Sequence, residues 1–143
     1  MKALVVYDSA SGNTDKVAQA ICSGMRQMGL SEVECKAANS VTMKDLSEAE
    51  VWVMGSPNGF LAGRKVQGVL RKAAGSGKHR GVAFDTRSPG MTTGSAQKIA
   101  QAMQASGIDL LGWTYFSLGP NKALMEGEEG MAVVYGRNLA TSI

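Results

Sequence analysis

Short apolar runs alternate along this chain with longer stretches in which apolar residues recur every three or four positions. A short run is typical of a buried strand, and the longer spacing is typical of a helix with one face on a core. The run at 51–54 is continuously apolar, which predicts a strand covered on both faces. The pattern as a whole predicts strands at 3–7, 33–37, 51–54, 81–84 and 108–116, and helices at 14–28, 64–74, around 96–103 and from 127 or 128 onward.

The spacing also predicts which side chains face the core. The first helix is expected to bury Val17, Ile21, Met25 and Met28, and the final helix Met131, Val134, Tyr135 and Leu139. The last strand is expected to bury Leu110 and Leu111. Residues 38–49 are ambiguous, because their pattern fits either a loop or one or two helical turns.

Five strands in alternation with helices predict one parallel sheet with helices on both faces. The chain has no internal repeat and no linker, so residues 1–143 are expected to form a single domain. Right-handed crossovers favour a doubly wound, three-layer α/β/α fold with strand order 2-1-3-4-5.

The turn after the first strand is the strongest candidate for a ligand-binding site. It reads Ser9-Ala10-Ser11-Gly12-Asn13-Thr14 and lies immediately before the first helix. Unpaired amides at a helix start, together with the helix dipole, attract anions, and Gly12 permits backbone conformations that let amides converge. The hydroxyls and the Asn13 amide could complete an uncharged phosphate cage. An ordinary capped turn is the alternative, because Ser, Asn and Thr are also good helix caps.

Two further loops follow the third and fourth strands. The first reads Gly55-Ser56-Pro57-Asn58-Gly59-Phe60 and the second runs over 85–91, starting with Asp85, Thr86 and Arg87. Doubly wound sheets bind ligands at the carboxyl ends of their strands, so both loops are expected beside the first turn.

These loops resemble a known family. Ser-x-Ser-Gly-Asn-Thr after a first strand is similar to the FMN-phosphate loop of flavodoxins, and Gly-Ser-Pro-x-x-Phe is similar to their second flavin-contacting loop. The resemblance implies FMN as cofactor. It also implies that residues 9–14 hold the phosphate, that 56–60 line one ring face with Phe60 as the aromatic contact, and that 85–87 lie at the pyrimidine side or its rim.

The third loop departs from the family pattern, because it contains no Tyr or Trp to stack on the second ring face. Met91, the backbone or a partner could cover that face, or it could stay open. Trp113, Tyr115 and Phe116 are expected to pack at the sheet edge rather than to contact a cofactor. Arg64, Lys65 and Arg87 lie in or just after the two ring-side loops, opposed locally by Asp85. Arg87 is expected to be a partly exposed cation near the ring, where it would raise the reduction potential of the hydroquinone couple.

The resemblance implies an electron carrier that shuttles electrons between redox enzymes, with a partner that the sequence does not identify. One alternative is an FMN-dependent reductase or dehydrogenase acting on a quinone or porphyrin-like substrate. A weaker alternative is a flavin-free binding module on the same fold. No catalytic residue is assigned, and a monomer is expected, with a dimer possible.

Charge and composition indicate which classes of ligand and partner are not expected. The net charge of +3 is evenly spread without a basic run, which does not favour nucleic-acid binding. No apolar run approaches the roughly 20 residues of a membrane span, and the N-terminus lacks signal-peptide features, so a cytoplasmic protein is expected. His79 is the only histidine, and no metal site is expected. Cys22 and Cys35 are expected to be small buried apolar residues rather than a redox pair.

Overall fold

The computed structural model describes residues 1–8, 12–59, 63–73, 75 and 77–143. Its strands are β1 (Lys2–Tyr7), β2 (Glu32–Ala37), β3 (Val51–Pro57), β4 (Arg80–Arg87) and β5 (Asp109–Ser117). Its α-helices are α1 (Asn13–Gln27), α2 (Met43–Glu48), α3 (Arg64–Lys72), α4 (Ser95–Ala105) and α5 (Glu128–Ser142), and a short 3-10 helix, η1, spans Ala38–Ser40.

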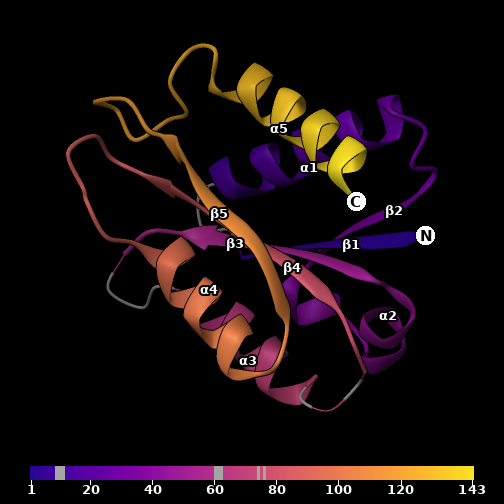
Figure 1. The fold of residues 1–143 in the computed structure, drawn as a ribbon. Coiled ribbons are helices and arrows are strands. Elements are labelled where there is room, and N and C mark those ends of the chain that lie inside the picture. The colour runs from indigo at the N-terminus through magenta and orange to yellow at the C-terminus, as the bar shows by residue number, and fades with distance from the viewer. Residues whose placement is uncertain (9–11, 60–62, 74, 76) are drawn as a thin grey trace.

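The five strands form one parallel sheet in the order β2-β1-β3-β4-β5, which confirms the predicted α/β fold and strand order. Helices α1 and α5 lie on one face of the sheet, and α2, α3 and α4 lie on the other (Figure 1). The carboxyl ends of β1, β3 and β4 therefore meet at one edge of the molecule, where ligands bind in such sheets.

Alternating strand residues supply two cores, one on each face of the sheet. Val5 and Val53 point toward α1 and α5, whereas Trp52 and Met54 point toward α2, α3 and α4. The Trp52 indole donates a hydrogen bond to the Leu46 carbonyl at 3.1 Å and stacks on the buried His79 ring at 4.1 Å. This stacking explains the only histidine of the sequence as part of the core.

Two strands are longer than their apolar runs predict. The predicted strands end at 54 and 84, but β3 continues to Pro57 and β4 continues to Arg87. The polar ends remain in the sheet because β4 is paired on both sides, with β3 through Pro57↔Thr86 and with β5 through Arg87↔Ser117. The prediction of a loop at 55–57 and 85–87 is therefore wrong.

Four side chains that were predicted to be buried are exposed. Met28 is 48% exposed, because α1 ends at Gln27 and Met28 already follows its last turn. Leu111 is 42% exposed, because a register shift between β4 and β5 lies beside it. Met131 and Val134 are exposed, and α5 instead buries Ala132, Gly136 and Leu139.

The offset face of α5 follows from its close approach to α1. A Cβ atom at Gly136 would overlap the backbone carbonyl of Ile21, and a Cβ atom at Gly24 would overlap the carbonyl of Val133. Two helices can approach to backbone contact only where side chains are missing. The small residues Ala132 and Gly136 therefore turn inward, and the long Met131 side chain turns outward.

Gly136→Ala is expected to lower the free energy of unfolding by about 2 kcal/mol, because overpacking forces the backbones apart. Gly130→Ala is the matched control on the same helix, since no heavy atom lies within 4 Å of its Cβ position. The control should leave stability unchanged or raise it by up to about 1 kcal/mol, because alanine is the better helix former. Urea unfolding of the two variants measures both values, and equal effects would contradict the backbone contact.

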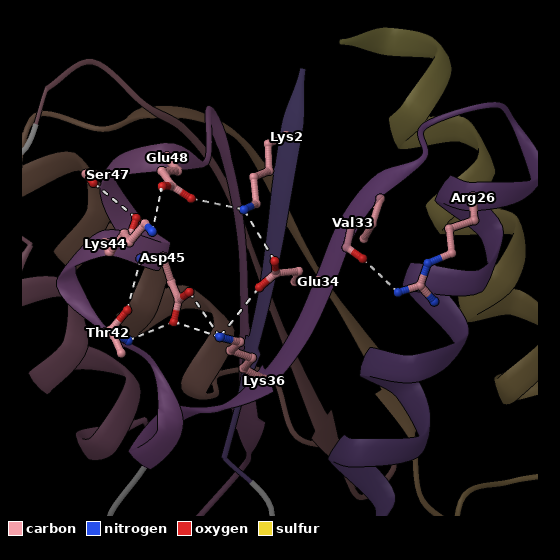
Figure 2. A network of polar contacts seen from close by, with 10 residues as sticks. All are labelled: Lys2, Arg26, Val33, Glu34, Lys36, Thr42, Lys44, Asp45, Ser47 and Glu48. Carbon is pink, nitrogen blue, oxygen red and sulfur yellow. Dashed lines mark hydrogen bonds and ion pairs between the residues drawn. The ribbon is translucent and has the colours of Figure 1, made fainter.

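The ambiguous segment 38–49 forms η1 and α2. The Thr42 hydroxyl accepts a hydrogen bond from the Asp45 amide at 3.1 Å, and the Asp45 carboxylate accepts one from the Thr42 amide at 2.9 Å. Lys36 of β2 adds an ion pair to Asp45 at 3.0 Å (Figure 2). This reciprocal capping box fixes the start of α2.

Asp45 gives a pH-dependent contribution to stability. The hydrogen bond from the Thr42 amide, followed by the one from Lys36, lowers the pKa of Asp45 to about 2. Because the folded pKa lies below the unfolded one, this contribution is complete above about pH 4 and is lost as the pH falls toward 2. Asp45→Asn is therefore expected to lower stability by about 1 kcal/mol at pH 7 and by less at pH 3.

Urea unfolding of Asp45→Asn at pH 7 and pH 3 measures the difference. Glu126→Gln, an exposed carboxylate outside the network, is the control and should show no such pH dependence. A deficit for Asp45→Asn of the same size at both pH values would contradict the assignment.

No helix within the part of the chain that the structure describes combines the length and apolar character needed to cross a bilayer.

Candidate functional site

Backbone pairing at the carboxyl ends of β1, β3 and β4 brings the three predicted loops together. Tyr7 is in register with Gly55, and Gly55 with Phe84. The Asp8 amide donates to the Gly55 carbonyl at 3.0 Å, and the Asn58 amide donates to the Thr86 carbonyl at 2.9 Å. The ends of the three strands therefore form one continuous edge from which the loops leave.

The start of α1 lies at this edge. Ser9, Ala10 and Ser11 lie outside the described residues. Gly12 precedes the helix with φ +87°, in the left-handed region that favours glycine, and no heavy atom lies within 4 Å of its Cβ position. Space is thus open beside the first amides of a 15-residue helix, which is where an anion binds.

The polar side chains of α1's first turn hold other segments. The Asn13 side-chain amide donates to the Lys122 carbonyl at 2.7 Å. The Thr14 hydroxyl is 1% exposed and shares a hydrogen bond of 3.1 Å with the Thr86 hydroxyl of β4. The helix start is therefore tied to the end of β4 and to the connection between β5 and α5.

That connection is the part of the site that the sequence analysis missed. Leu118 and Leu124 pair in an antiparallel bridge, and the Gly119 amide donates to the Ala123 carbonyl at 2.7 Å. Lys122 closes this turn with φ +62° and places its backbone against Asn13. Pro120 and Asn121 signal a turn, but nothing local in the sequence shows which helix the turn will contact.

A lysine of α3 lies next to the residue that precedes the uncharged segment 9–14. The Lys65 ammonium lies 3.8 Å from the carboxylate of Asp8, directly after β1. The sequence pattern predicted a neutral cage from 9–14 alone. The fold adds one cation, paired with Asp8, from a distant segment.

Asn58 connects the second loop to the third. Its side-chain oxygen accepts from the Ser95 amide at 3.1 Å, and its side-chain amide lies 3.3 Å from the Met91 sulfur. Ser56 is fully buried, with its hydroxyl on the Pro57 carbonyl at 3.1 Å, whereas Gly59 is exposed. Phe60, the predicted aromatic contact, lies outside the described residues.

Asp85 and Arg87 form a buried ion pair at the end of β4. The Arg87 guanidinium donates to both carboxylate oxygens, at 2.8 and 2.6 Å, and the side chains are 0% and 2% exposed. Asp85 also accepts from the Ala96 amide at 2.8 Å, and Arg87 donates to the Met91 carbonyl at 3.3 Å. The hydrogen bonds to Asp85 raise the pKa of Arg87.

The prediction that Arg87 is a partly exposed cation is therefore wrong. Its charge is neutralised by Asp85 beneath the surface, so it cannot act as a free charge on a ring. Together with Thr86, which is 1% exposed, the pair forms a layer that anchors the 88–94 loop to α4.

Aromatic residues of β5 lie next to this layer. The Arg87 guanidinium carbon lies 4.3 Å from the centre of the Tyr115 ring and 5.8 Å from that of Trp113. Phe116 packs in the core against Phe84, whereas Tyr115 and Trp113, on the edge strand β5, remain 48% and 43% exposed. The fold thus supplies exposed aromatics near the end of β4, although the third loop itself has none.

No protein-family model matches the chain. A flavodoxin of Aquifex aeolicus (strain VF5) is 38% identical over 56 residues, a match that spans 39% of this chain and 30% of that protein. A flavodoxin from the domain Archaea superposes with a TM-score of 0.78 at 24% identity, covering 99% of this chain and 98% of that one. The chain has the flavodoxin fold.

A second solved flavodoxin structure has the same fold as this chain. The two-electron reduced flavodoxin of Megasphaera elsdenii superposes with a TM-score of 0.77 at 20% identity, covering 97% of this chain and 98% of that one. The resemblance to flavodoxins that the loop sequences predict is confirmed. In the flavodoxin fold, the edge formed by β1, β3 and β4 is the ligand edge of the sheet.

Proposed function

We propose that this chain is an FMN-binding electron-transfer protein of the flavodoxin type. The observation that carries the proposal is the position of one sequence motif in the fold. The motif Ser-x-Ser-Gly-Asn-Thr falls at the turn from β1 to α1 within a flavodoxin fold, beside the carboxyl ends of β3 and β4.

The residues at this edge fit a phosphate monoester. Open space lies at Gly12, directly before the amides of Asn13 and Thr14, and the helix dipole favours an anion there. Ser9 and Ser11 would add hydroxyl donors. Pro57, Asn58, Gly59 and Phe60 would line one side of the isoalloxazine ring, whereas the fully buried Ser56 would support this loop from within the sheet.

On the other side of the ring, the burial of Asp85, Thr86 and Arg87 refines the assignment. We assign the contacts there to the exposed 88–93 segment, which these three residues hold in place. Bound FMN would supply one- and two-electron redox chemistry. The chain would bind the phosphate, orient the ring and shield part of it from water.

A fluorescence titration of the apoprotein with FMN tests this proposal. We expect FMN fluorescence to be quenched to a 1:1 end point and the complex to keep its yellow colour after gel filtration. Riboflavin, which lacks the phosphate, should bind at least about 100-fold more weakly, because its loss removes the charge-assisted hydrogen bonds. Unchanged FMN fluorescence at high micromolar protein would overturn the proposal.

A redox partner protein and a cytoplasmic location follow from the same proposal. After photoreduction, the FMN-loaded protein should pass electrons to a one-electron acceptor such as cytochrome c. It should not turn over NAD(P)H or a quinone by itself in steady state. Sustained turnover without a partner would instead support the reductase alternative.

A further inference from the structure

The two cysteines of the chain lie on adjacent elements away from the ligand edge. Cys22 on α1 is fully buried, and Cys35 on β2 is half-buried at the edge strand of the sheet. Both thiols are free, and Cys35 packs against the same core cluster to which Cys22 belongs. The sequence predicts two small buried apolar residues rather than a redox pair, but the fold places the two cysteines on adjacent elements.

A neighbouring hydrogen bond fixes their register. The Arg26 guanidinium donates to the Val33 carbonyl at 2.7 Å and joins α1 to β2 (Figure 2). Cys22 lies four residues before Arg26, about 6 Å back along the helix. Cys35 lies two residues after Val33, about 7 Å forward along the strand.

These two displacements point in the same direction. Because β1 and β2 are parallel, the helix that connects them runs antiparallel to β2. Cys22 and Cys35 therefore come to the same level, and both side chains face the space between helix and sheet. Each of the two sulfurs shifts the pKa of the other.

The contact makes the two sulfurs unequal. The hydrogen bond from Cys35, helped by the nearby Arg26 charge, lowers the pKa of Cys22. The same contact and burial raise the pKa of Cys35. Cys22 is thus the more acidic of the two and is buried, whereas Cys35 is the one that solvent can reach.

We propose that Cys22 and Cys35 form a reversible intramolecular disulfide that joins α1 to β2 when the protein meets a small disulfide oxidant. In the first step, the Cys35 thiol loses its proton as its sulfur attacks one sulfur of the oxidant; the S–S bond of the oxidant breaks, and the released half takes up a proton as the first thiol. In the second step, the Cys22 thiol loses its proton as its sulfur attacks the Cys35 sulfur of the mixed disulfide, and the second half of the oxidant leaves and takes up a proton as the second thiol.

The exchange balances. The two cysteines lose two electrons and two protons, and the small disulfide gains them as two thiols. A cytosolic glutathione pool keeps such a pair reduced, so the bond would report a shift to oxidising conditions. The crosslink would tether α1, the helix whose N-terminus forms the candidate phosphate site, but the proposal does not depend on FMN.

Intact mass measurement of the full chain tests the proposal. The protein is incubated with millimolar oxidised glutathione under native conditions, denatured, and treated with N-ethylmaleimide. We expect a mass two hydrogens lower, no maleimide adduct, and a peptide that links residues 22 and 35. Dithiothreitol should restore two maleimide-reactive thiols, and oxidation should raise Tm by at least about 5 °C.

Three outcomes would overturn the proposal: two maleimide adducts after prolonged oxidation, a stable glutathione adduct on the wild type, or a dimer linked between chains. Cys22→Ser should stop at a glutathione adduct on Cys35 without a gain in Tm. Cys35→Ser should leave the buried Cys22 unmodified in the folded protein. If either variant fails to fold, the wild-type masses alone decide between the outcomes.

Discussion

Replacing Asp85 with alanine is expected to lower the free energy of unfolding by about 3–5 kcal/mol, the largest effect of any single change at the ligand edge. Without its carboxylate, the Arg87 guanidinium would remain 2% exposed with no counter-ion. The Ala96 amide at the start of α4 would lose its acceptor as well. Urea unfolding of the apoprotein at pH 7 gives the difference directly.

Two further variants separate the buried charge from a general effect of losing an aspartate. Asp109→Ala removes an exposed carboxylate from β5 and should change stability by no more than about 0.5 kcal/mol. The double variant Asp85→Leu, Arg87→Leu removes both charges and should recover part of the loss, because no unpaired ion is left behind. A double variant less stable than Asp85→Ala would contradict this interpretation of the pair.

Asn13→Asp is expected to weaken FMN binding by about 100-fold, equivalent to about 2.7 kcal/mol. The substitution places a carboxylate at the first residue of α1, where the proposed phosphate carries negative charge of its own. It also removes the amide that donates to the Lys122 carbonyl, so the turn at 118–124 loses its contact with the helix. Fluorescence titration with FMN measures the loss.

Riboflavin distinguishes charge repulsion from a disturbed fold. If the new carboxylate acts on the phosphate, riboflavin binding should change far less than FMN binding. Asn138→Asp introduces the same charge on the exposed surface of α5 and should leave both affinities unchanged. An equal loss for both flavins would show that the substitution perturbs the site rather than the phosphate contact.

The two predictions address two layers of one edge. The exposed layer consists of loops that would touch a ligand, and the buried layer consists of Asp85, Thr86 and Arg87, which hold those loops against α4 and α1. Paired charges placed beneath a site fix its geometry without adding net charge to it. The loop from 88 to 94 can therefore lack an aromatic residue and still keep a defined position.

Local pattern was sufficient for the fold. Apolar runs such as 51–54 predicted the strands, and the polar turn at 9–14 predicted where the first helix starts, because both signals depend on residues close in sequence. The order of strands followed from crossover handedness, which is a general property of parallel sheets. The motif at 9–14 indicated the candidate ligand edge because its signal, too, depends only on residues close in sequence.

Predictions of side-chain burial from the sequence pattern failed where residues distant in sequence surround the side chain. The periodicity of α5 is compatible with burying Met131, but backbone contact between Gly136 and Ile21 turns a different face inward. Arg87 is an ordinary loop cation in the sequence, and only the pairing of β4 on both sides buries it with Asp85.

By itself, then, the sequence determined the five strands, four of the helices and the turn at the candidate ligand edge, because hydrophobic period and glycine-containing turns act over a few residues. Only the tertiary structure decided that Asp85 neutralises Arg87, that the turn at Lys122 closes on Asn13, and that the thiols of Cys22 and Cys35 meet. Each of these contacts joins two separate elements. Charge compensation, hydrogen bonding and thiol contact act between atoms, and the distance between atoms of separate elements is set by how those elements pack.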